Sequence, residues 1–148
     1  MMKPSPIRIR WIGWLLLLIV LIACTAYDHD VPDTEANLAG FARHFGFTVP
    51  ADVTDVYYFA DELGADVLYQ LGFEASPETV ARIVAALDLA PSISETTGLE
   101  LAYDFPWWDE TDIEQATGYR KSTEERDYVR ALWYSERTGR VYYLEYSL

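Results

Sequence analysis

Apolar residues recur at helical spacing in two stretches of the chain. The first helix is expected to begin after the start signature Pro32 to Thr34 and to end at Gly46. The second begins with an N-cap serine, a proline at the first helical position and an acid in the first turn, and it stops before Pro91. The two apolar stripes are Leu38, Phe41, Ala42 and Phe45 in the first helix and Val80, Ile83, Val84 and Leu87 in the second.

Strand-like patterns predict five strands, at 53–60, 66–74, 99–103, 127–134 and 140–148. The first two form one hairpin and the last two another, with Gly139 supplying the left-handed conformation that such a turn requires. The strand at 66–74 alternates clearly, so one of its faces is expected to be buried and the other mostly wet. The intervening region 104–127 has no period and is expected to be irregular.

This order of elements predicts an α+β domain, in which an antiparallel sheet of about five strands carries both helices on one face, in the order α-β-β-α-β-β-β. The chain has 148 residues, which fits one folded domain, taken as 33–148. Tyr58 and Tyr143 lie on strand faces that we expect to offer exposed aromatic surface to a partner.

The N-terminus has the layout of a secretory signal. Lys3, Arg8 and Arg10 precede a run of thirteen residues, Trp11 to Ala23, that is apolar on all sides. A membrane-spanning helix needs about 20 apolar residues, so the run is short for a permanent anchor.

The run ends in Leu-Ile-Ala-Cys, residues 21–24, which resembles the bacterial lipobox. This resemblance implies that residues 1–23 are removed, that Cys24 is lipidated, and that residues 24–32 form a short tether to the cell membrane. Thr25 follows the cysteine instead of aspartate, which by the same resemblance favours the outer membrane where a cell has two. An ordinary signal peptide or a short anchor remains the alternative. Cys24 is the chain's single cysteine, so the folded part has no disulfide and no cysteine nucleophile.

The mature part is similar to small bacterial lipoproteins. The similarity covers the stretch from Val49 to Leu87, with its Leu-Gly-Phe-Glu-Ala-Ser motif at 71–76, and the Leu-Trp-Tyr at 132–134. It implies an envelope location and carries no catalytic residues over to this chain.

Charge narrows the choice of partners. All 24 acidic residues follow Cys24, whereas three of the 11 basic ones precede it, which leaves 24 acids against eight bases, a formal net charge of −16. Nucleic acid is therefore excluded as a partner, because phosphates require clustered lysine and arginine. Anionic lipid headgroups disfavour the same acidic surface, whereas basic partners are attracted to it.

One cluster suggests a ligand site, formed by Trp107, Trp108, Asp109 and Asp112. Flat aromatic faces beside carboxylates can stack sugars and bond their hydroxyls. The competing interpretation is that the tryptophans turn inward and cap the core while the acids stay in water, and we favour it.

The sequence gives weaker support for a metal site or a catalytic site. The acids and histidine of 28–33 have the ligand types of a metal site, but solvated charge in a tether explains them, and His44 fits a packing residue on its helix. No cofactor, metal or catalytic constellation is expected. The sequence thus predicts a non-enzymatic envelope lipoprotein that binds a protein partner. The alternative is a glycan-binding or glycan-hydrolysing protein that uses the loop from Asp104 to Glu114.

Overall fold

A computed structural model describes residues 28–62, 66–92, 98–123 and 128–147 of the chain. The lipobox and Cys24 lie outside these residues. The elements along the chain are α2 (Glu35–Phe45), β1 (Thr54–Asp61), β2 (Val67–Glu74), α3 (Pro77–Ala86), β3 (Ala90–Ser92), a 3₁₀ helix (Leu99–Leu101), α4 (Glu110–Ile113), β4 (Thr117–Thr123), β5 (Tyr128–Ser135) and β6 (Arg140–Ser147).

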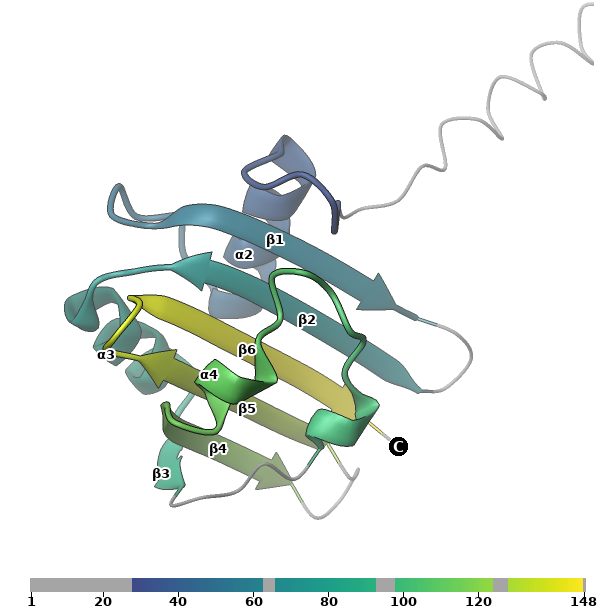
Figure 1. The fold of residues 1–148 in the computed structure, drawn as a ribbon, viewed down its shortest axis with the longest axis vertical. Helices are drawn as coiled ribbons and strands as arrows, with labels where there is room; N and C mark the ends of the chain where they lie inside the picture. Colours follow the sequence, from purple (N-terminus) through teal and green to yellow (C-terminus); the bar gives the residue numbers. More distant parts are fainter. Residues whose placement is uncertain (1–27, 63–65, 93–97, 124–127, 148) are drawn as a thin grey trace, which may run out of the picture.

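The strands form one antiparallel sheet in the order β1-β2-β6-β5-β4-β3 (Figure 1). The predicted α+β class with an antiparallel sheet is confirmed, and both predicted hairpins are present, as β1–β2 and β5–β6. Within the described residues the sheet has six strands, one more than expected. The C-terminal strand β6 lies between β2 and β5 in the interior of the sheet, and β1 and β3 form its two edges.

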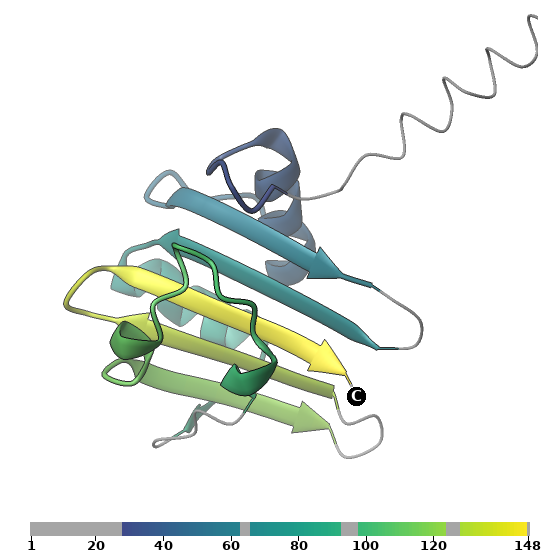
Figure 2. The ribbon, with the colours of Figure 1, turned by 45° about the vertical axis from the view of Figure 1, so that its right-hand side comes forward.

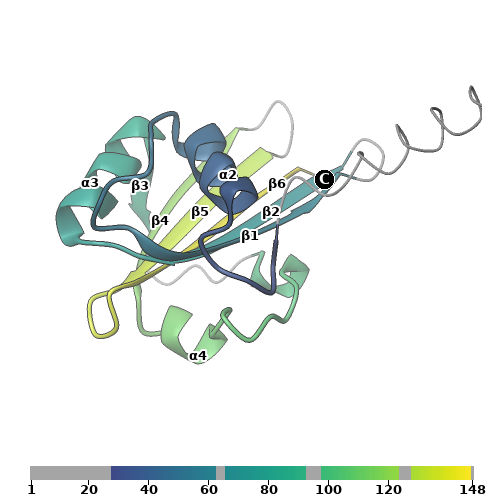
Figure 3. The same ribbon diagram turned by 90° about the horizontal axis from the view of Figure 1, so that it is seen from above.

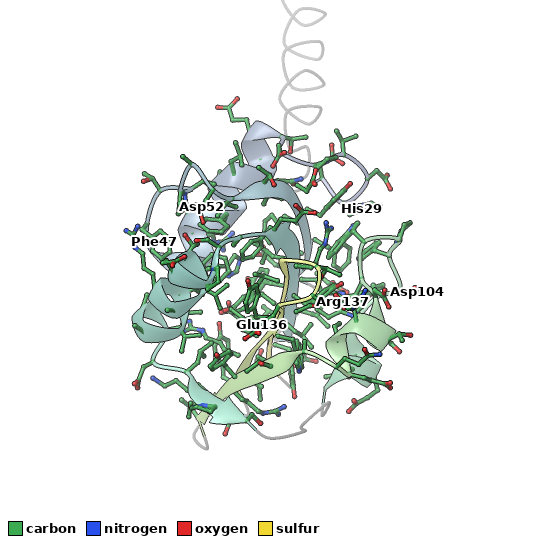
Figure 4. All side chains as sticks on the ribbon, turned by 60° about the vertical axis from the view of Figure 1, so that its left-hand side comes forward. His29, Phe47, Asp52, Asp104, Glu136 and Arg137 are labelled. Atoms are coloured by element: carbon green, nitrogen blue, oxygen red, sulfur yellow. The ribbon has the colours of Figure 1, made fainter. Side chains whose placement is uncertain are left out.

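Both faces of the sheet are covered. Helices α2 and α3 lie on one face, and the segment from the 3₁₀ helix to α4 crosses the other (Figure 3). Each layer encloses its own apolar cluster, with Phe41, Leu71, Ile83 and Tyr143 under the two helices and Trp107, Ile113, Trp133 and Leu144 under the crossing segment. In Figure 4, Phe47 and Asp52 lie on the helical side and His29 and Asp104 on the other.

Local signals define the two long helices. The Thr34 hydroxyl accepts the N–H of Asn37 at 3.2 Å, and Gly46 ends α2 with a left-handed φ of 76°. At α3, the Ser76 hydroxyl accepts the N–H of Thr79 at 3.3 Å. Hydrogen bonds from Ser76, followed by one from Thr79, outweigh a small effect of burial and lower the pKa of the nearby Asp52 to about 2.

The prediction of a strand at 99–103 is wrong. Leu99–Leu101 is a 3₁₀ helix after Gly98, whose φ is 95°. The reason is that this segment crosses the face of the sheet, where no strand edge is available. Instead, the buried Gln70 side chain accepts the N–H of Tyr103 at 2.7 Å and donates to its carbonyl at 3.1 Å, which takes the place of strand pairing.

The region 104–127 is also more regular than its sequence indicated. It contains the short α4 and the strand β4. β4 is mostly polar and half exposed, so it lacks the apolar alternation of the other strands. It forms because β5 offers it a long antiparallel edge, from Thr117↔Tyr134 to Thr123↔Tyr128. The edge strand β3, after α3, pairs with β4 in turn.

The face of β2 expected to be mostly wet is buried. Gln70 and Gly72 are both inside, under the crossing segment, and a Cβ built on Gly72 would lie 2.5 Å from a ring carbon of Trp107. Tyr58 and Tyr143, considered as exposed aromatic surface, are 1% and 0% exposed because α2 covers them. The sheet is therefore the middle of three layers.

This close approach makes Gly72 a sensitive position. We expect Gly72→Ala to lower the free energy of unfolding by about 1–3 kcal/mol, because the indole of Trp107 must move to admit a methyl group. Urea unfolding followed by tryptophan fluorescence measures it. Gly118→Ala on β4 is the comparison: its nearest contact is 3.2 Å away, so its loss is expected to be smaller. Equal losses at both positions would contradict the prediction.

Candidate functional site

The predicted Trp–Asp cluster forms part of the layer that crosses the sheet opposite α2 and α3 (Figure 2). Trp107 is 7% exposed, and its ring is stacked between Tyr57 at 5.4 Å and Phe105 at 5.1 Å, nearly parallel to both. Its indole N–H donates to the carbonyl of His29 at 2.8 Å. Both flat faces and the polar atom of Trp107 are thus occupied, which leaves no face on which a sugar could stack.

Trp108 is 4% exposed and contacts Trp133 and Tyr142 edge-on, at 6.3 Å and 5.6 Å between ring centroids. Its buried indole N–H has no hydrogen-bond partner among the described residues. Both tryptophans therefore lie inward, which is the arrangement we favoured from the sequence. The burial of their rings, worth several kcal/mol in such settings, holds the crossing segment against the sheet.

The two aspartates of the cluster hold this layer together. Asp109 accepts the N–H of Asp112 at 3.1 Å and so caps α4. Asp112, only 2% exposed, does not stay in water as expected. Its carboxylate accepts four side-chain hydrogen bonds that tie α4 to the β5–β6 hairpin: from Ser135 at 2.8 Å, Arg137 at 2.6 Å, Thr138 at 2.9 Å and Tyr142 at 3.1 Å.

These bonds also set the charge state of Asp112. Burial raises the pKa of its carboxyl, but the hydrogen bonds from Ser135, Thr138, Arg137 and Tyr142 outweigh burial and bring the pKa below its usual value. The carboxylate is therefore charged and fully engaged within the protein.

A groove of about 380 Å³ lies beside this cluster, and Trp107 and Asp109 are the two predicted residues that line it. Arg140 borders it and lies 3.8 Å from Glu74 and 5.7 Å from the ring centre of Tyr57. The edge of an indole and a capping carboxylate are thus what the cluster presents to this groove.

A second polar cluster, which the sequence did not indicate, lies under α2. The Nδ1 of His44 is 2.8 Å from a carboxylate oxygen of Glu145, and its Nε2 is 2.9 Å from the hydroxyl of Tyr58. The same carboxylate accepts a hydrogen bond from the hydroxyl of Tyr143 and lies 3.4 Å from the guanidinium of Arg130. Burial raises the pKa of both tyrosine hydroxyls, so they remain donors.

A histidine paired with a carboxylate can act as an acid or base, but this pair is enclosed. The side chains of His44 and Glu145 are 5% and 4% exposed, and neither lines the groove beside Trp107 or the one over α3. His44 is indeed a packing residue. The sequence contains one signal that could have indicated the burial of Glu145. It follows Val141 and Tyr143 on the same face of a strand, and an acid buried there requires a hydrogen-bond or ion-pair partner.

The groove over α3 has a different character. It measures about 340 Å³ and lies between α3 and strands β4 and β5, lined by Pro77, Val80, Ala81, Val84, Ala85, Asp88, Leu89, Tyr119, Tyr134 and Glu136. Eight of these ten residues are apolar or aromatic, and both acids are exposed. In Figure 4, Glu136 lies on the β5–β6 turn next to Arg137.

The described part of the predicted tether is attached to the domain. Asn37, which is fully buried, accepts the N–H of Asp28 at 2.7 Å, and its amide nitrogen lies within 2.9 Å of the carbonyl oxygens of Asp28, Val31 and Val56. The carboxylate of Asp33 accepts the N–H groups of Asp55 and Val56 on β1. Residues 28–33 therefore follow the outer edge of β1, and among the described residues no group of acids and histidines forms a metal cluster.

No protein-family model, curated protein or solved structure matches this chain. Within the described residues, no helix combines the length and the apolar character needed to cross a membrane.

The role of Asp112 predicts a pH-dependent stability. Because its carboxyl binds a proton less tightly when folded than when unfolded, its contribution is present at pH values above the ordinary carboxyl pKa of about 4 and is lost progressively as the pH falls through the lowered pKa of the folded state. We expect Asp112→Asn to cost about 2–4 kcal/mol at pH 7 and less at pH 3. Urea unfolding at both pH values measures this. Asp104→Asn, at an exposed loop acid, is the control, and a loss at Asp112 that is independent of pH would contradict the prediction.

Proposed function

We propose that this protein is a lipid-anchored, non-enzymatic protein on the extracytoplasmic side of the cell membrane or outer membrane, where it binds a protein partner. The lipobox-like sequence ending at Cys24 supports this lipid-anchored, extracytoplasmic location. The apolar groove over α3 is the observation that carries the binding function.

The arrangement of polar side chains supports binding over catalysis. The histidine–carboxylate pair under α2 is enclosed, and the carboxylate of Asp112 is satisfied by four donors. A catalytic acid or base must reach the substrate atom that it protonates or deprotonates. These groups instead satisfy one another inside the domain.

The attachment of residues 28–33 gives the domain a defined position. Only residues 25–27 separate Cys24 from Asp28, and extended backbone spans at most about 3.6 Å per residue. The lipidated residue then lies within roughly 15 Å of Asp28. The domain is thus held beside the headgroups along the β1 edge of its sheet.

The groove over α3 lies toward the other edge. Its strand residues come from β4 and β5, whereas residues 28–33 attach to β1, and β2 and β6 lie between them in the sheet. Figure 1 shows α3 and β3 well away from the point where the chain enters the domain. A groove in this position is open to a protein partner that projects from or lies beyond the membrane surface.

The anchor is tested by Cys24→Ala. We expect the variant to appear in the soluble fraction or to remain unprocessed, because two or three acyl chains at about 0.8 kcal/mol per buried CH₂ hold a protein that its own charge does not attract to the bilayer. Fractionation and immunoblotting measure this, with Thr25→Ala as the matched control. Membrane retention of Cys24→Ala at the processed size would refute the anchor.

The partner is tested by affinity capture from detergent-solubilised envelope. Ala81 is an exposed residue of α3 in the groove, and Ala39 is an exposed residue of α2 outside it. We expect Ala81→Arg to reduce recovery of the captured protein at least tenfold, because a long charged side chain fills the groove, while Ala39→Arg leaves recovery unchanged.

Arginine is a good helix former, so both variants are expected to fold. Circular dichroism checks this before the capture experiment. If the immobilised wild-type protein retains nothing beyond what the uncoupled resin retains, the proposed partner binding is wrong.

A further inference from the structure

The floor of the groove over α3 is apolar and belongs to the domain core. Val80, Leu89 and Tyr134 are 3%, 7% and 8% exposed, and the half-buried Val84 and Tyr119 border them. A space of about 340 Å³ with such a floor holds a few apolar side chains of a partner. Their burial at about 25 cal/mol per Å² supplies affinity.

One wall of the groove allows close approach. Pro77, Ala81 and Ala85 lie at i, i+4 and i+8 along α3 and are all exposed. None of them projects far from the helix, so the backbone of a second segment can lie against this wall. This is the packing geometry by which one helix presents a groove to another.

The rim of the groove is acidic. Asp88 and Glu136 line it, and Glu78 lies beside Pro77 at the start of α3; all three are exposed. Lys121 pairs with Asp88 at 3.0 Å and offsets part of this charge. The negative charge of the rim also acts on Tyr134 in the floor. Burial raises the pKa of the Tyr134 hydroxyl most, and the charges of Glu136 and Glu78 raise it further.

We infer that the groove over α3 binds a basic amphipathic segment of a protein partner, with its apolar side chains on Val80, Val84 and Tyr134 and its lysines or arginines beside Glu78 and Glu136. This inference rests on the proposed function and specifies the partner's chemistry. Charge complementarity selects this occupant, because an acidic segment would be repelled at the rim. The formal net charge of −13 for the whole chain acts in the same direction.

The probe is a synthetic 14-residue peptide of leucine and lysine with leucines at helical spacing, compared with a leucine–glutamate peptide of the same pattern. Binding to the purified, detergent-solubilised protein is followed by fluorescence anisotropy at two salt concentrations. We expect the leucine–lysine peptide to bind with micromolar affinity that falls as salt rises, and the glutamate peptide to bind at least tenfold more weakly.

Variants locate the binding. Ala81→Arg and, as a second groove variant, Ala85→Arg are expected to weaken the leucine–lysine peptide at least tenfold, whereas Ala39→Arg on α2 does not. The double variant Glu78→Gln/Glu136→Gln is expected to weaken it several-fold and to reduce its salt dependence. Asp104→Asn/Glu114→Gln removes the same charge at exposed positions outside the groove, and we expect it to bind the peptide like the wild type.

Two outcomes overturn the inference. One is that the wild-type protein does not bind the leucine–lysine peptide at millimolar concentration, or binds the glutamate peptide equally well. The other is that groove and control variants lose affinity alike, which would mean attraction to the acidic surface in general. Either result leaves envelope capture by the wild-type protein unaffected. Failure of that capture would instead remove the proposed partner, so the two failures are distinguishable.

Discussion

The structure depends on the burial of β6 from both sides. Every residue from Val141 to Tyr146 is buried, because α2 and α3 cover one face of the sheet and the segment carrying Trp107 and Trp108 covers the other. A strand in this position has no wet face, so each polar side chain on it or beside it needs a partner inside the protein. The carboxylate of Glu145 is hydrogen-bonded or ion-paired with His44, Tyr143 and Arg130. On the neighbouring β2, the side chain of Gln70 is hydrogen-bonded to the backbone of Tyr103.

This constraint explains why groups that resemble catalytic or ligand-binding residues serve the fold. Asp112 is surrounded by donors from the β5–β6 hairpin, and both faces of the Trp107 ring are covered by other rings. Such networks are costly to disrupt, since a partner left alone in the interior keeps its full desolvation penalty. At the margin of the helical layer, by contrast, the groove over α3 combines an apolar floor with an acidic rim.

The N-terminal attachment connects this architecture to the proposed location. Asn37 binds three carbonyl oxygens and one N–H, so residues 28–33 are held along β1 as part of the domain. An anchor at Cys24 would then orient the domain as well as retain it. The groove over α3 and residues 28–33 lie toward opposite edges of one sheet. With an anchor at Cys24, the strands between them would keep the acidic groove away from headgroups that its charge disfavours.

Elements whose signals are local could be predicted from the amino-acid sequence. Thr34, Gly46, Ser76 and Pro77 mark helix ends through their own hydrogen bonds and dihedral angles, and the two hairpins follow from strand alternation around short turns. The lipobox resemblance at Cys24 and the acidic charge are likewise properties of the sequence alone.

Which neighbour each segment meets depends instead on how the whole domain packs. The polar segment 117–123 became a strand because β5 presented an edge, and Leu99–Tyr103 did not because it crossed a face. Tyr58 and Tyr143 are buried, and Trp107 faces inward, because a second layer covers each side of the sheet. Pairing and burial are properties of surfaces that form only when distant segments come together, so local patterns do not specify them.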